Sequence, residues 1–362
     1  MPPSQPRKLS PLVLALLCLA GVAFNAVVLG PALAHSLHGQ NDFLGLYPGG
    51  RLAGTNGVYD PAQNAAVQQK ALGYSKPQLL FCRPPYYAAL MWPIARLPYF
   101  PAYLAFQALM LAAVATFVCV WPDIPTQTTL LAACWSLPLA AALAIGQDDA
   151  VLLAVLAVTA TLLNRRRNFA AGLVFCLCAI KPHLFLLTAV WIVARQMWRF
   201  AGGLAVGGVV LAALSLAAAG PDGFAAFLRT VTTPVINPGL EVMPNLNGLF
   251  HGNVTLEVAG AVVAAVLVGV AARSGSQQWA LGALLLGGLL TSHHAYIPDC
   301  TLLLPAALAM ASEADRPWQR YLALFLLAPI VYVGMFAGIA FVATACVVVL
   351  CGSFAIVPRT AR

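Results

Sequence analysis

Charged residues are scarce in this sequence, and acidic residues are scarcer still. Lys, Arg, Asp and Glu make up 8% of the 362 residues, and Asp and Glu together number 11. An ordinary soluble domain carries about 25% charged residues. Hydrophobic residues make up 61% of the chain, in recurring runs of roughly 18 or more residues that could cross a hydrocarbon core of about 30 Å. The composition excludes a soluble domain and predicts a polytopic membrane protein with one transmembrane domain, residues 1–362.

Two further absences narrow the class of protein. The 9 cysteines include no CxxC pair, so the sequence indicates neither a cysteine metal site nor a redox pair. No internal repeat is visible, which argues against a transporter built from inverted repeats.

The net charge of +8 comes largely from short basic clusters. Such clusters are typical of cytoplasmic loops and do not indicate a nucleic-acid partner. Their placement predicts that both termini are cytoplasmic. The clusters are Arg7-Lys8, Arg165–Arg167, Arg195 with Arg199, Arg273, Arg316 with Arg320, and Arg359 with Arg362.

Hydropathy divides the chain into about 10 to 13 spans and two long outward loops. The apolar run Leu9–Ala34 resembles a signal peptide, but it is longer than the 7–15 apolar residues of one, so we interpret it as a retained first span. Within the first loop, the composition of Pro61–Leu72 predicts a short interfacial helix. At Lys181-Pro182 we expect a broken helix that borders a cavity. The expected divisions are a first span (1–34), a catalytic outward loop (35–83), spans (84–219), a second outward loop (220–253) and further spans (254–362).

Several ionisable residues fall beside or inside apolar segments, where a charge is costly and indicates function. Asp42 follows the first span, and the alternative interpretation is a helix-capping aspartate. Arg83 could fork a phosphate or simply extend to the membrane interface. Lys181 follows a long uncharged stretch and needs either a phosphate or a counter-charge. One histidine of His293-His294 could serve as a proton or phosphate partner.

Asp148-Asp149 could bind a divalent cation. This interpretation is weaker, because the sequence has no further carboxylate close to the pair.

In order along the chain, a set of short motifs resembles glycosyltransferase family 87, whose members are membrane enzymes of the GT-C superfamily that use polyprenyl-phosphate sugars. The resemblance begins at Asn41-Asp42-Phe43 and ends at Ser292-His293-His294. Between them lie Tyr47, Gly50-Arg51, Val58–Pro61, Pro84-Pro85, Gly146-Gln147, Arg165–Arg167, Ala179–Pro182 and Asn245–Gly248.

The resemblance implies an all-α transmembrane helical bundle of GT-C type with a long first periplasmic loop, in the inner membrane, with its active site facing outward. It implies a polyprenyl-phosphate donor of a mannose- or arabinose-like sugar, a lipid or glycan acceptor, and direct displacement with inversion. Asp42 would be the general base. No metal or cofactor is required, because fixed cations would neutralise the leaving phosphate. Expected phosphate ligands are Arg51, Arg83, Lys181, His293 and His294, and expected acceptor or sugar ligands are Tyr47, Asp60 and Asn245.

Two other classes of protein stay open at this point. A lipid transporter or flippase would use the same cavity and cations without chemistry. An O-antigen-type ligase or polymerase would depend on a large late outward loop, whereas the longest outward loop here comes first.

Overall fold

The fold is seen in a computed structural model, which describes residues 9–233, 239–274, 276–314 and 316–336, together with 344 and 347. These residues form helices and connecting turns and contain no strand, so the expected all-α fold is confirmed. Part of the last expected apolar segment, Tyr321–Val357, lies outside the described residues.

Within the described residues, four helices are long and apolar enough to cross a membrane, or five segments if the bent pair α7 (Thr126–Trp135) and α8 (Leu137–Ile145) is one span. The described residues thus hold fewer single spanning helices than the 10 to 13 spans expected, because several apolar segments form shorter helices. The four long helices are α1 (Pro11–Val28), α6 (Tyr99–Val120), α12 (Trp198–Ala219) and α15 (Val254–Ser274).

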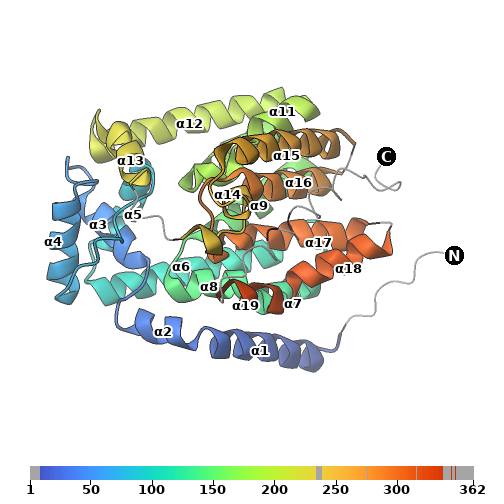
Figure 1. Cartoon of the computed structure of the whole chain (residues 1–362), viewed down its shortest axis with the longest axis horizontal. Helices are drawn as coiled ribbons and strands as arrows, with labels where there is room; N and C mark the ends of the chain where they lie inside the picture. Colours follow the sequence, from blue (N-terminus) through green and yellow to red (C-terminus); the bar gives the residue numbers. More distant parts are fainter. Residues whose placement is uncertain are drawn as a thin grey trace.

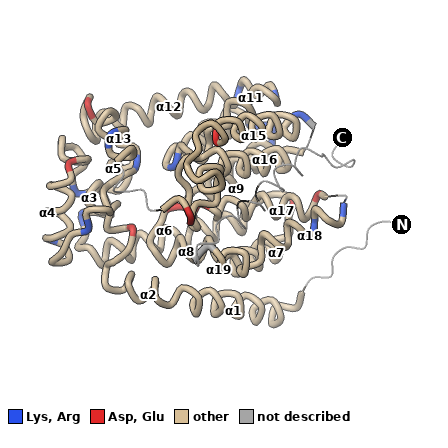
Figure 2. The backbone as a smooth tube through the Cα atoms, in the orientation of Figure 1, with Lys and Arg blue, Asp and Glu red and all other residues tan. Residues whose placement is uncertain are grey.

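Figure 1 shows the long helices running in roughly the same direction, with α1 and α2 along one side of the bundle and α12 along the other. Charged residues gather mostly at the two ends, beside α3, α4 and α13 at one end and beside α11, α15 and α18 at the other (Figure 2). The shorter elements are α2 (Gly30–Leu37), α3 (Phe43–Leu52), α4 (Pro61–Leu72), α5 (Pro85–Ala95), α9 (Asp149–Asn164), α10 (Asn168–Phe175), α11 (Thr188–Arg195), α13 (Gly223–Val231), α14 (Leu246–Leu249), α16 (Gln277–Thr291), α17 (Leu303–Glu313), α18 (Pro317–Leu327) and α19 (Ile330–Phe336), with 3₁₀ segments η1 (Cys176–Ile180), η2 (Pro182–Phe185), η4 (Leu240–Val242) and η5 (Ile297–Leu302).

The helix expected over Pro61–Leu72 is confirmed with those bounds as α4. Its first turn is capped by Asp60, whose side chain accepts hydrogen bonds from the backbone N–H groups of Ala62 and Gln63. Its last turn ends at Gly73, which adopts φ +77. The capping aspartate at one end and the glycine at the other explain why this helix could be predicted from the sequence.

The break expected at Lys181-Pro182 is also confirmed. The regular α-helix α10 ends at Phe175, and short 3₁₀ segments lie on either side of Lys181. Pro182 has no N–H to continue a helix, and Lys181 adopts an extended φ of −127°. The interruption turns the Lys181 side chain into the interior of the bundle, where it is 4% exposed.

Candidate active site

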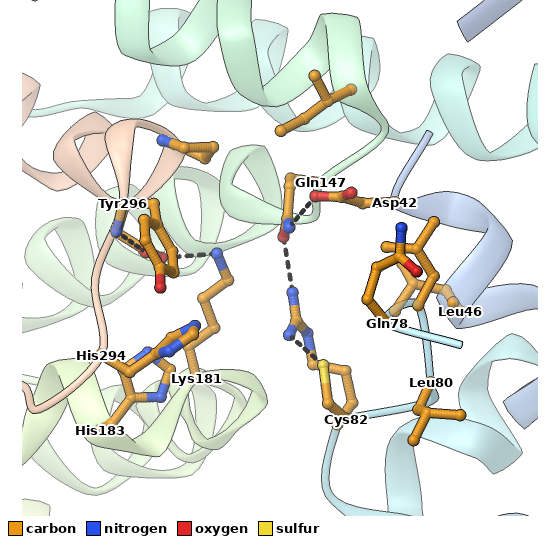
Figure 3. A pocket seen from close by; sticks show the side chains of 16 residues that line it. Asp42, Leu46, Gln78, Leu80, Cys82, Gln147, Lys181, His183, His294 and Tyr296 are labelled. Atoms are coloured by element: carbon orange, nitrogen blue, oxygen red, sulfur yellow. Dashed lines mark hydrogen bonds and ion pairs between the residues drawn. The ribbon is translucent and has the colours of Figure 1, made fainter. Parts of the chain in front are cut away.

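A cavity of about 400 Å³ lies where the first loop meets the broken helix, within the roughly 300–1,000 Å³ of small-molecule sites. In Figure 3, Lys181, His183, His294 and Tyr296 lie on one side of it, and Asp42, Leu46 and Gln78 lie on the other. The remaining lining residues are Gly45, Leu79, Leu80, Cys82, Arg83, Ile145, Gln147, Pro298 and Asp299.

Asp42 is held at the cavity wall by its backbone. Its N–H donates to the carbonyl of Ile145 at 2.7 Å, and the adjacent Asn41 accepts a hydrogen bond from the Tyr99 hydroxyl at 2.9 Å. Asp42 occupies the N-cap position of α3, yet its side chain makes no capping hydrogen bond. The carboxylate instead accepts a hydrogen bond from Gln147 at 2.6 Å. The capping interpretation therefore describes Asp60 but not the Asp42 side chain.

The end of α8 determines where Gln147 lies. Gly146 follows the helix with φ +74, and the N–H of Gln147 donates back to the carbonyl of Ala142 at 2.8 Å, which closes the helix as a Schellman-type turn. A Cβ on Gly146 would also lie 3.2 Å from the Cβ of Phe43. Glycine is therefore favoured here by both backbone conformation and space.

Five charged side chains form a buried ion cluster beside Gln147: Arg83, Asp148, Asp149, Lys181 and Asp299. The Arg83 guanidinium binds both carboxylate oxygens of Asp148, each at 2.8 Å. The Lys181 ammonium donates to Asp149 at 2.8 Å and to Asp299 at 2.7 Å. None of the five is more than 8% exposed.

The ion cluster supplies the counter-charges that a lysine at this depth requires. Asp299 is 118 residues from Lys181 in sequence, so the pairing was not visible along the chain. The cluster holds two cations against three carboxylates, and Asp42 adds a fourth carboxylate at the cavity wall. The predicted phosphate ligands Arg83 and Lys181 are thus already paired, and their role toward a phosphate stays a prediction.

The pair Asp148-Asp149 is engaged by Arg83 and Lys181 rather than left open as a cation site. Among the residues that the structure describes, no group of three or more His, Cys, Asp and Glu side chains is arranged to hold a metal ion.

Two histidines line the cavity, and one of them was not predicted as a site residue. The rings of His183 and His294 meet edge to face with centroids 5.9 Å apart, and His294 also packs against Tyr296. His183 Nε2 is buried without a hydrogen-bond partner among the described residues. Its position two residues after Lys181, just past the helix break, was the available signal.

The other predicted site residues lie outside the cavity lining. His293 points away, with 75% of its side chain exposed and its Nδ1 3.0 Å from Glu257. Arg51 is exposed and donates to the carbonyl of Ala95. Tyr47 is buried and donates to the carbonyl of Leu97. Asn245 is buried, donates to the carbonyl of Ser292 and caps α14.

Burial raises the pKa of the Asp42 carboxyl above its ordinary value of 3.8, while the hydrogen bond from Gln147 and the charge of Arg83 oppose that rise. Burial lowers the pKa of the His294 imidazole, which favours its neutral form. The cavity thus brings together a carboxylate that could accept a proton, neutral imidazoles and a buried guanidinium, a set suited to acid–base chemistry.

The chain is similar to glycosyltransferase family 87, whose sequence model matches residues 81–305, well over half of the 362 residues. The matched part contains the whole ion cluster and both cavity histidines, and it begins after Asp42. Neither the curated proteins nor the solved structures gave a match.

Lys181→Met is expected to lower the free energy of unfolding by about 3–5 kcal/mol, because it leaves two buried carboxylates without their cation. Lys181→Arg keeps the charge and should retain far more stability and activity. The measurement is thermal unfolding of the purified protein in detergent.

Lys70→Met serves as the control, since Lys70 is exposed on α4. Combining Lys181→Met with Asp149→Asn should cost less than the sum of the single changes. Equal stability of the Met and Arg variants would show that the charge of Lys181 does not hold the ion cluster together.

Proposed function

This chain belongs to glycosyltransferase family 87, and on that premise we propose that it transfers a mannose- or arabinose-like sugar from a polyprenyl-phosphate donor to a lipid or glycan acceptor. The reaction takes place at the outer face of the inner membrane. The observation that carries the proposal is the Asp42 carboxylate, which lines the cavity and is not used to cap a helix.

Asp42 acts as the general base in this proposal. It takes the proton from the acceptor hydroxyl while that oxygen attacks the anomeric carbon, and the bond from that carbon to the donor phosphate breaks. The phosphate leaves with the bonding electron pair. Because the hydroxyl attacks the anomeric carbon from the face opposite the phosphate, displacement occurs with inversion. Within the described part of the chain, Gln147 is the one side chain that hydrogen-bonds the carboxylate, which leaves room for an acceptor hydroxyl.

Hydrogen-bond donors on side chains around the cavity could bind the leaving phosphate. The Nη1 atom of Arg83 has a weak 3.6 Å contact with the Cys82 sulfur, while its other nitrogens hold Asp148 and Gln147. His183 Nε2 has no partner among the described residues, and it would donate in the tautomer that carries the proton on this nitrogen. Fixed donors of this kind stabilise charge that develops in the transition state, and they support a phosphate leaving group.

An apolar groove of about 510 Å³ supports a lipid-linked substrate. It lies among α1, α2, α6, α7 and α8. Helices α1 and α6 are long and apolar enough to cross a membrane, and α7 and α8 form the bent pair. Leu143 and Ala144 line the groove and Ile145 lines the cavity. The carboxyl end of α8 therefore borders both, so a lipid chain in the groove would have its phosphate near the ion cluster.

Asp42→Asn is expected to reduce sugar transfer by about 10²–10⁴-fold, because an amide cannot accept the proton from the acceptor hydroxyl. Donor binding should survive, since the size of the side chain is kept. The measurement is transfer from a polyprenyl-phosphate sugar in proteoliposomes, with donor binding followed separately.

Asp60→Asn is a matched control, because Asp60 caps α4 outside the cavity. Transfer by Asp42→Asn within a few-fold of wild type would remove the general base from the mechanism. A wild-type protein that moves the lipid between leaflets without transferring sugar would identify a flippase.

Ala26→Trp should raise the KM for a long-chain donor at least several-fold, because the indole would fill the groove that Ala26 lines. Ala23→Trp is the control, since Ala23 is exposed on the same helix and does not line the groove. Equal KM values for the two variants would show that the donor chain lies elsewhere.

The outward orientation is tested at two exposed positions. Ala66→Cys on α4 should react with a membrane-impermeant thiol reagent applied to spheroplasts, and Arg166→Cys should react only after permeabilisation. The unmodified chain sets the background from native cysteines. The reverse pattern would place the cavity on the cytoplasmic side.

A further inference from the structure

Gln147 lies between the ion cluster and Asp42 and contacts both. Its amide nitrogen donates to Asp42 Oδ2 at 2.6 Å, and its amide oxygen accepts from Arg83 Nη2 at 2.7 Å. Figure 3 shows the Gln147 side chain beside Asp42 at the cavity wall, with a dashed line for the hydrogen bond between them. Among the described residues, Gln147 is the one side chain that forms hydrogen bonds with both Asp42 and Arg83.

The orientation of the Gln147 amide follows from the chemistry of its neighbours. A guanidinium has only donors and an ionised carboxylate has only acceptors. The amide oxygen must therefore face Arg83, and the amide nitrogen must face Asp42. Because Asp148 holds the guanidinium at two points, Arg83 cannot rotate freely, and the amide is fixed in turn.

We infer that Gln147 is a positioning residue for the reaction: it holds one oxygen of Asp42 so that the other faces the acceptor hydroxyl, and it transmits the fixed geometry of the ion cluster to the base. This inference rests on the proposed function, in which Asp42 accepts the proton. Gln147 acts through Asp42 and takes no proton itself.

The contact with Gln147 should also affect the pH at which the Asp42 carboxyl ionises. The charged and titratable groups that act on Asp42 are Arg83, Lys181, Asp148 and Tyr99. A hydrogen bond from Gln147 stabilises the carboxylate form, so removing it should raise the pKa of Asp42 further. Since the base must be ionised, activity should then be lost at a higher pH as the solution is acidified.

Gln147→Met removes both hydrogen bonds, whereas Gln147→Glu keeps an acceptor for Arg83 and replaces the donor to Asp42 with a second carboxylate. If Gln147 is a positioning residue, the acidic limb of the kcat/KM profile should move to higher pH by about one unit in the Met variant. This shift is equivalent to about tenfold in the ionisation equilibrium. The shift should be larger in the Glu variant. In both variants, kcat should fall by roughly tenfold or more while KM for the donor stays within a few-fold.

A merely structural role predicts the opposite ranking. If Gln147 only supports Arg83, the Glu variant should be tolerated, because Arg83 gains an ion pair, and the Met variant should be the weaker one. Gln278→Met is the matched control: the Gln278 amide also donates to an aspartate, Asp123, at 2.7 Å, but it lies outside the cavity lining. Its acidic limb should match wild type.

Infrared titration of the carboxyl bands in the purified protein tests the same contact without relying on catalysis. The band missing from Asp42→Asn identifies Asp42, and its midpoint should move to higher pH in Gln147→Met and still higher in Gln147→Glu. Unchanged midpoints, or a tolerated Glu variant, would overturn the inference. Absence of sugar transfer by the wild-type protein would overturn the proposed function instead, and the infrared result would still decide whether Gln147 controls Asp42.

Discussion

The contact on which the site depends is the pairing of Lys181 with two carboxylates inside an apolar bundle. An isolated ammonium at this depth is costly, and so is an isolated carboxylate. Lys181 joins Asp149, at the start of α9, to Asp299, in η5. Because each buried charge requires an opposite charge beside it, only a few packing arrangements of the broken helix, α9 and η5 keep every charge paired. The ion cluster thereby fixes the wall of the cavity.

Rigidity in the ion cluster has a consequence for Asp42, which lies on a different part of the chain. The backbone of Asp42 is fixed by the end of α8, and its side chain is joined to Arg83 through the Gln147 amide. The carboxyl end of α8 thus holds both the backbone of Asp42, through Ile145, and its side chain, through Gln147. A general base is effective when its geometry is set before the substrate binds. For the role proposed for Asp42, this arrangement supplies that condition without placing a positive charge directly on the carboxylate.

Local signals were sufficient to predict part of this arrangement from the sequence. The all-α membrane class follows from composition, α4 from its cap and terminal glycine, and the break at Lys181 from the proline after it. Contacts between distant segments were not predictable in this way, because Asp299 is 118 residues from Lys181 and no periodicity connects them. Residues adjacent in sequence can also lie in different environments: His294 lines the cavity, while His293 is exposed. A polar residue in an outward loop can equally be a cap, as Asp60 is.

The charge balance of the cavity bears on how an anionic donor could bind there. Carboxylates outnumber cations in the ion cluster itself, so net positive charge cannot be what attracts a phosphate. Two hydrogen-bonding atoms remain. Arg83 Nη1 has the Cys82 sulfur as its one hydrogen-bond partner among the described residues, and the buried Nε2 of His183 can donate in the tautomer that carries its proton there. Hydrogen bonds of this kind become stronger as negative charge develops on the leaving oxygen. They therefore stabilise the transition state more than they stabilise the bound sugar donor. A site built in this way would bind its donor modestly and hold the departing phosphate more tightly, which is the order that catalysis requires.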